Sequence, residues 1–270
     1  MAKIRAQTLK GFRDFLPTEA RKRQYVVNKL KAAFESFGFE PLETPALEYE
    51  EILLGKYGTE GDKLMYRFTD NGGRKVALRY DQTVPLARVV AQYQNQLPMP
   101  FKRYQIQPVW RAENTQKGRF REFLQCDIDT VGSSSPLSDA EIITCTVKSF
   151  EALGFSNFTI LINDRSILNI FAVEEVRIID KIEKIGIDGV IAELVEKNLE
   201  SRDIAQKKIN DLKSIQPPES IKQIMNNLSK LGVDNSKVEF SPTLARGLDY
   251  YTGMIFEVKV EGYGAGSVAG

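Results

Sequence analysis

The chain has 270 residues, of which 42% are hydrophobic and 27% are charged, and its formal net charge is +1. This composition is typical of a globular protein with an ample core, and the balanced charge excludes a generally basic nucleic-acid coat protein. The sequence contains no histidine, which excludes Ser-His and Cys-His catalysis and removes the commonest zinc ligand. Chemistry that relies on positioning and charge stabilisation, such as adenylyl or phosphoryl transfer, remains open.

The two cysteines, Cys126 and Cys145, lack the spacing of a metal site, and the chain starts without a secretory apolar segment. We therefore expect free thiols in a cytoplasmic protein. No apolar run approaches the ~20 residues that cross a bilayer, so no membrane role is expected.

The first strongly periodic segment predicts a helix over residues 18–37, with Thr18 as its N-cap and Gly38 as its stop signal. Residues 39–48 follow as an extended segment that Pro41 and Pro45 interrupt. Because proline restricts strand pairing to edges and interfaces, this segment is expected at one of them.

A hairpin is predicted next, with strands at 65–68 and 75–78 around the turn sequence Asp-Asn-Gly-Gly. The second strand leads to Asp81 and Thr83, which precede a predicted helix over 84–94. Taken alone, these two side chains are most simply caps of that helix.

A second hairpin occupies residues 110–129. Its first strand ends at Arg111, a polar loop covers 113–118, and its second strand begins near Arg119 or Phe120. This loop is longer than a tight turn requires, which indicates a functional role. Residues 101–125 hold six basic and two acidic side chains, so the hairpin suits a phosphate, and its aromatic residues suit a purine. A solvated basic hairpin with core aromatics is the alternative.

Gln125, Asp127 and Asp129 alternate along the second strand of this hairpin, so they share one face of it. Three polar side chains on one face are unusual in a core.

The second half of the chain predicts a helix that ends at Leu153 and opens with a capping box formed by Ser138 and Glu141, then a strand over 159–163. The composition changes near Val173, and residues 174–235 predict three or four helices, interrupted by glycines and a Pro-Pro pair. Their charges form either a solvated surface or an RNA contact. Strands are predicted over 238–240 and 249–260.

Two peptides resemble known family motifs. Arg-Ala-Glu at 111–113, followed by a loop and Lys-Gly-Arg-Phe-Arg-Glu-Phe at 117–123, is similar to motif 2 of the class II aminoacyl-tRNA synthetases. Leu-Ala-Arg-Gly-Leu-Asp-Tyr-Tyr-Thr-Gly at 244–253 resembles the signature peptide of histidyl-tRNA synthetases. Gly-Phe-Arg-Asp at 11–14 and Leu-Arg-Tyr-Asp-Gln-Thr at 78–83 extend the resemblance over almost the whole chain.

The resemblance implies an α+β fold of the class II synthetase type, in which helices flank an antiparallel sheet. It divides the chain into a catalytic core with motifs 1 and 2 at 1–173, a helical insertion at 174–237, and a return to the core at 238–270.

The resemblance also implies roles for individual side chains. The catalytic residues are Arg111 and Arg246, which grip the α-phosphate from two sides. The ATP-binding residues are Arg111, Glu113 for the adenine amino group, Arg119 for the γ-phosphate, and Phe123 for stacking. The histidine-binding residues are Asp81, Thr83 and Gln125 for the ammonium and carboxylate, and Asp129 with Tyr250 or Tyr251 for the imidazole. Aspartate stands at both carboxylate positions, where bacterial relatives often have glutamate. No side chain is expected to bind metal directly, and Mg²⁺ arrives with ATP.

The implied activity is the activation of histidine with ATP to histidyl-adenylate and its transfer to the 3′ end of tRNA(His), by a homodimer that forms through residues 39–48. Motif 3 and an anticodon-binding domain are not among the 270 residues, so these residues by themselves are expected to have impaired activity. Two alternatives stay open. One is the non-catalytic regulatory subunit of ATP phosphoribosyltransferase, and the other is a synthetase-like regulatory domain of a larger kinase.

Overall fold

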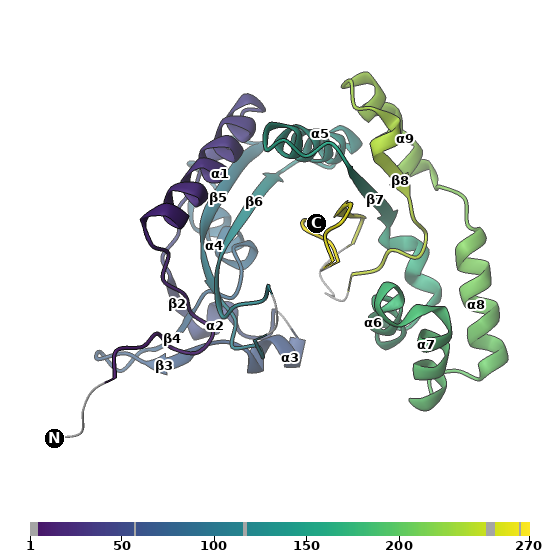
Figure 1. Cartoon of the computed structure of the whole chain (residues 1–270), viewed down its shortest axis with the longest axis horizontal. Coiled ribbons are helices and arrows are strands. Elements are labelled where there is room, and N and C mark those ends of the chain that lie inside the picture. Colours follow the sequence, from purple (N-terminus) through teal and green to yellow (C-terminus); the bar gives the residue numbers. More distant parts are fainter. Residues whose placement is uncertain (1–4, 57, 116–117, 247–251, 265) are drawn as a thin grey trace. The chain divides into compact units, whose positions relative to one another are not determined.

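The computed structural model describes residues 5–56, 58–115, 118–246, 252–264 and 266–270, and Figure 1 shows their helices and strands. The chain divides into two compact units, Met1–Ser133 and Ser134–Gly270. Each unit contains both helices and strands, and most strand pairs are antiparallel. The predicted α+β class is confirmed.

The first unit has two small sheets, with strand orders β1-β5-β6 and β2-β4-β3. Its elements are α1 (Pro17–Ser36), β1 (Glu40–Pro41), β2 (Leu47–Tyr49), α2 (Glu50–Leu53), α3 (Gly58–Lys63), β3 (Arg67–Thr69), β4 (Lys75–Leu78), α4 (Thr83–Tyr93), β5 (Phe101–Trp110) and β6 (Glu122–Val131). Only the short strand β1 pairs in parallel with its neighbour, β5.

Helix α1 packs against β5 through Phe34 and Tyr104, whose ring centroids are 5.8 Å apart. The Tyr104 hydroxyl donates a hydrogen bond to Glu35 at 2.7 Å. The prediction of Thr18 as N-cap is wrong, because the helix already begins at Pro17 and its N-cap residue makes no side-chain bond. The predicted end is confirmed: Gly38 follows with a φ of 76°, which favours glycine.

Both predicted hairpins are present. Strands β3 and β4 pair antiparallel around the turn, and β5 and β6 pair over ten residues each. However, β6 begins at Glu122, later than the predicted start near Arg119 or Phe120. At Arg121 the carbonyl still accepts from the N–H of Arg111, which directly follows β5, but the Arg121 N–H donates to the Gly11 carbonyl.

The second unit contains a sheet of order β8-β7-β9, in which β8 is parallel and β9 antiparallel to the central strand. Its elements are α5 (Pro136–Ala152), β7 (Phe158–Asp164), the 3₁₀ helix η1 (Arg165–Ile170), α6 (Val173–Ile179), α7 (Ile182–Glu196), α8 (Arg202–Ser214), α9 (Glu219–Lys230), η2 (Asn235–Lys237), β8 (Val238–Phe240) and β9 (Met254–Val260). Helices α6 to α9 confirm the prediction of three or four helices in 174–235.

These four helices contribute to two different apolar clusters. Helices α6, α7 and α8 pack together with η1 around residues such as Ile178, Leu194 and Ile209, which are at most 1% exposed. Helix α9 packs instead with α5 and the sheet, around Ile143, Ile160 and other buried residues. The helical segment therefore shares its core with the strands of its unit.

Helix α5 begins at Pro136, and its N-cap is Ser135, whose hydroxyl accepts from the Leu137 N–H at 3.2 Å. The predicted capping box at Ser138 and Glu141 is therefore wrong, because Ser138 already lies in the first turn. Strand β9 begins at Met254; part of the strand predicted from residue 249 lies outside the described residues. Among the helices that the structure describes, none is long and apolar enough to cross a membrane.

Candidate active site

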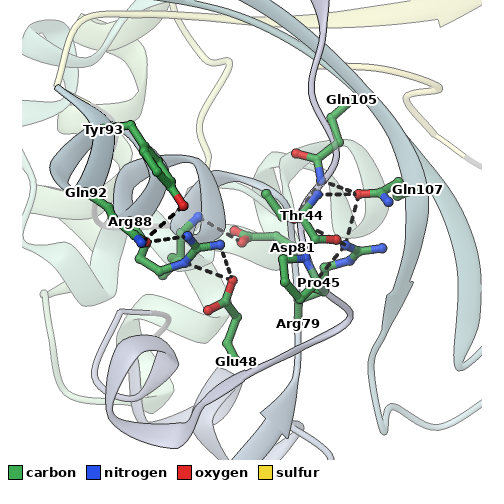
Figure 2. Close-up of polar contacts among 11 residues, drawn as sticks. Thr44, Pro45, Glu48, Arg79, Asp81, Arg88, Gln92, Tyr93, Gln105 and Gln107 are labelled. Atoms are coloured by element: carbon green, nitrogen blue, oxygen red, sulfur yellow. Dashed lines mark hydrogen bonds and ion pairs between the residues drawn. The ribbon is translucent and has the colours of Figure 1, made fainter. Parts of the chain in front are cut away.

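The side chain of Arg79 connects three segments of the first unit, and Figure 2 shows part of this network. Arg79 is 2% exposed. Nη1 donates to the Thr44 carbonyl at 2.6 Å and to Gln107 Oε1 at 3.0 Å. Nε donates to the Pro108 carbonyl at 2.8 Å. The end of β4, the segment before β2 and strand β5 are thus held by one guanidinium. Burial lowers the pKa of Arg79.

Helix α4 is fixed by a second arginine in the same view. Arg88 donates from Nε and Nη2 to Glu48 Oε1 at 3.1 and 2.8 Å, and Glu48 is a buried carboxylate of β2. Because α4 and the end of β4 are both held in place, the peptide that joins them and carries Asp81 lies beside β5, where Gln82 Nε2 donates to the Gln107 carbonyl at 2.9 Å.

Arg111 lies directly after β5, between two aromatic rings. Its guanidinium carbon is 4.6 Å from the ring centroid of Tyr80 and 5.1 Å from that of Phe123. Its Nε donates to the Tyr80 carbonyl at 3.1 Å. Neither terminal nitrogen of this guanidinium has a hydrogen-bond acceptor among the described residues, so both can bind an anion.

Glu113 lies at the edge of this group, where its Oε1 is 3.4 Å from the Tyr80 hydroxyl that donates to it. Burial raises the pKa of Tyr80, so the phenol stays a neutral donor. The structure thus brings together three of the four residues predicted to bind ATP: Arg111, Glu113 and Phe123. Arg119, the fourth, is exposed on the loop.

The predicted histidine-binding carboxylates surround a buried cation. Arg103, which is fully buried in β5, places Nη2 2.6 Å from Asp129 Oδ2. Burial, Asp129 and Asp81 raise the pKa of Asp127 to about 6 against the lowering effects of Arg103 and Gln125. Burial and Asp81 raise the pKa of Asp129 against the lowering effect of Arg103. The side chains of β5 and β6 therefore place one buried guanidinium beside two carboxyl groups, those of Asp127 and Asp129.

Asp81 is 5% exposed, and its Oδ1 accepts from the Val84 N–H at 3.2 Å. The Asp81 carboxylate thus satisfies one backbone donor in the first turn of α4. The N-cap residue of this helix is Gln82, which makes no side-chain cap bond, and Thr83 is the first helical residue, so the prediction that Thr83 caps the helix is wrong. Gln125 donates from Nε2 to both oxygens of Asp127, at 3.1 and 2.9 Å. The shared face predicted for the polar residues of β6 is present.

The second unit contains Arg246, whose Nη1 donates to Glu257 Oε1 of β9 at 2.7 Å. The segment before it is held by Asn163, a fully buried side chain of β7, which donates to the carbonyls of Pro242 and Leu244 at 3.0 and 2.8 Å. Tyr250 and Tyr251, predicted at the imidazole, lie outside the described residues.

Sequence reasoning did not assign roles to several residues that shape these sites: Tyr80, Arg103, Asp127 and Glu257. A signal for Arg103 exists, because Arg103, Gln105 and Gln107 alternate along β5 and so share one face of an otherwise apolar strand. That alternation is the counterpart of the polar face on β6.

The fold is that of the class II aminoacyl-tRNA synthetases. A solved histidyl-tRNA synthetase from Nostoc sp. PCC 7120 superposes with a TM-score of 0.80 at 34% identity, covering 97% of this chain and 66% of that one. The family model for histidyl-tRNA synthetase matches residues 11–185.

Two curated relatives named histidine–tRNA ligase agree. The one from Treponema denticola is 43% identical over 94% of this chain and 63% of its own length, and the one from Aeropyrum pernix is 44% identical over all of this chain and 68% of its own length. The chain belongs to the histidyl-tRNA synthetase family, and it spans about two thirds of the length of these relatives.

Proposed function

We propose that the protein activates histidine with ATP to form histidyl-adenylate and transfers the histidyl group to the 3′ end of tRNA(His). The observation that carries the proposal is the placement of Arg111. A carbonyl and two aromatic rings fix its guanidinium, and its terminal nitrogens remain available to a phosphate. Glu113 and Phe123 lie beside it, where an adenine amino group and ring need an acceptor and a stacking surface.

In the proposed reaction, a carboxylate oxygen of histidine attacks the α-phosphorus of ATP, a P–O bond forms, and pyrophosphate leaves with its bonding electron pair. Negative charge grows on the α-phosphate oxygens, and Arg111 and Arg246 stabilise it. Arg119 contacts the γ-phosphate, and Mg²⁺ enters as part of the ATP substrate. No side chain needs to take up a proton in this step, which is compatible with a chain without histidine.

The amino acid binds along the face shared by β5 and β6 and the start of α4. Asp81, Thr83 and Gln125 hold the ammonium and carboxylate groups. Asp129 accepts an imidazole N–H, with Tyr250 or Tyr251 as the second partner. The ion pair between Arg103 and Asp129 keeps the carboxylate oriented while leaving its other oxygen as an acceptor.

The proposal includes the larger assembly. The domains are a core at 1–173, a helical insertion at 174–237, and a return to the core at 238–270. The protein acts as a homodimer in the cytoplasm, where tRNA is charged.

The test is ATP–pyrophosphate exchange with histidine and with a panel of other amino acids, followed by charging of tRNA(His). Exchange that requires histidine supports the proposal. Histidine binding is measured in parallel by calorimetry. Histidine binding without exchange or charging, in a protein that contains motif 3, would favour a regulatory subunit instead.

A further inference from the structure

Gln125 and Asp127 form a pair on β6 that the proposed roles do not explain. The amide nitrogen of Gln125 donates to both carboxylate oxygens of Asp127. The amide oxygen of Gln125, Oε1, is buried and has no hydrogen-bond donor among the residues that the structure describes. A buried carbonyl oxygen normally has a donor, and where the protein supplies none a ligand or a water does.

We propose that Asp127 is a positioning residue that fixes the orientation of the Gln125 amide, so that Gln125 Oε1 accepts a hydrogen bond from the α-ammonium group of the bound amino acid. The inference rests on the proposed function, in which Gln125 holds that end of histidine. It adds the reason why the amide presents its oxygen rather than its nitrogen.

The reason is the donor and acceptor inventory of the two groups. An ionised carboxylate only accepts hydrogen bonds, so the amide beside it has to turn its NH₂ group towards it and its oxygen away. A protonated carboxyl group, or an asparagine amide, both donates and accepts, and is compatible with either amide orientation. In the second orientation, the Gln125 NH₂ group would face the ammonium group, and two donors would oppose each other.

The charged groups around Asp127 come from three segments: Asp129 on β6, Arg103 on β5, and Asp81 before α4. Burial, Asp129 and Asp81 raise the pKa of Asp127 to about 6, against the lowering effect of Arg103 and Gln125. The carboxylate therefore exists above this pH, and orientation of the amide is lost as the pH falls through it. Affinity for the amino acid should fall in the same window.

Asp127→Asn is the variant that tests the proposal, because it keeps the size of the side chain and removes the acceptor-only character. At about pH 8, its KM for histidine in pyrophosphate exchange and its calorimetric Kd should rise about tenfold, the effect of one lost hydrogen bond to a charged group, while the KM for ATP stays unchanged. The ratio of wild-type to variant kcat/KM should approach one at about pH 5, where Asp127 is protonated in the wild type. The imidazole of the substrate titrates equally in both reactions and cancels in this ratio.

Asp139→Asn is the matched control. Asp139 lies in α5, its pKa is also raised by burial, and the same substitution there should leave histidine kinetics unchanged. An Asp127→Asn protein with wild-type KM for histidine at every pH, or with equal increases for histidine and ATP, would overturn the proposal.

If the Asp127→Asn variant does not fold, the proposal can still be tested on the wild-type protein. The NMR signals of the Gln125 side-chain NH₂ group should titrate with a midpoint near the pKa of Asp127, in the absence of histidine. A flat profile would refute the positioning role. A wild-type protein that shows this titration but binds no histidine would contradict the proposed function instead.

Discussion

At the scale of single residues, Arg103 is a fully buried guanidinium beside Asp129, in the proposed amino-acid site. If Asp129 had a purely structural role, Arg103 would be the cation with which it pairs. Yet the pKa of Asp127 and of Asp129 is raised in spite of Arg103. Burial is the largest cause of both shifts, and the neighbouring carboxylates add to it against Arg103. A cationic group of a ligand would be favoured beside these carboxylates.

Arg103→Met tests this charge balance. Without the guanidinium, the folded-state pKa values of Asp127 and Asp129 rise further above their unfolded values. The folded state then binds more protons than the unfolded state over a wider range, so stability falls as the pH rises. We expect a loss of about 3–5 kcal/mol in the free energy of unfolding at about pH 8, the usual cost of breaking a buried ion pair, and a smaller loss at about pH 5.

Urea denaturation at the two pH values measures this difference. Arg67→Met, which removes an exposed arginine paired with Glu50, is the control and should change stability by less than about 1 kcal/mol. An Arg103→Met loss that is the same at both pH values would show that packing, rather than charge, explains the effect.

At the scale of elements, the segment that carries Arg246 depends on one buried amide. Asn163 of β7 donates to two carbonyls of the 242–244 segment. Its replacement by alanine leaves both acceptors without that donor. Since each such loss costs about 1–3 kcal/mol, Asn163→Ala should lower the free energy of unfolding by about 2–5 kcal/mol.

The same variant should also lower the rate of pyrophosphate exchange, because Arg246 follows this segment directly. Asn157→Ala, an exposed asparagine immediately before β7, is the matched control and should be nearly neutral in both measurements. If the Asn163→Ala protein equals the wild type in both stability and exchange rate, Asn163 of β7 does not position Arg246.

Local sequence signals predicted the elements well where a short pattern decides the structure. The turn at 70–73, the glycine after α1 and the strand at 158–164 are examples. The helix starts were predicted poorly, since Pro17 and Pro136 open their helices ahead of the hydroxyl residues Thr18 and Ser138. Proline at the first helical position was the stronger signal.

The polar face of β6 could be predicted for the same reason, because alternation is local. The partners of that face could not. Arg103 stands opposite Asp129 only through the register of β5 and β6, and Arg246 contacts Glu257, a residue of β9. Such contacts depend on the three-dimensional pairing of distant residues, which no single stretch of sequence specifies.

At the scale of the whole molecule, the assembly state is open to a direct test. Strand β2 pairs with β4 on one side and has no further strand partner in the described part of the chain. Leu47 and Tyr49 on it are 42% and 52% exposed. Apolar side chains on an edge strand favour an interface, in agreement with the predicted dimer contact at 39–48.

Sedimentation at micromolar concentration should therefore give a dimer, and the double variant Leu47→Glu/Tyr49→Glu should shift it to a monomer. Leu231→Glu, which changes a leucine of similar exposure in the second unit, should leave the dimer intact. A wild-type monomer would contradict the predicted dimer. A dimer that tolerates both charges would show that its interface lies elsewhere.

The central claim is that Arg111 acts on charge that grows during adenylate formation. The most direct test measures Arg111→Ala twice, by histidine-dependent pyrophosphate exchange and by calorimetric binding of histidine, with Arg74→Ala, an exposed arginine of the same unit, as the control. The account predicts that exchange falls about 10²–10³-fold, as for other losses of a charge-stabilising donor, while histidine affinity hardly changes and the control equals the wild type. Equal losses of exchange and of histidine binding, or an unchanged exchange rate, would contradict it.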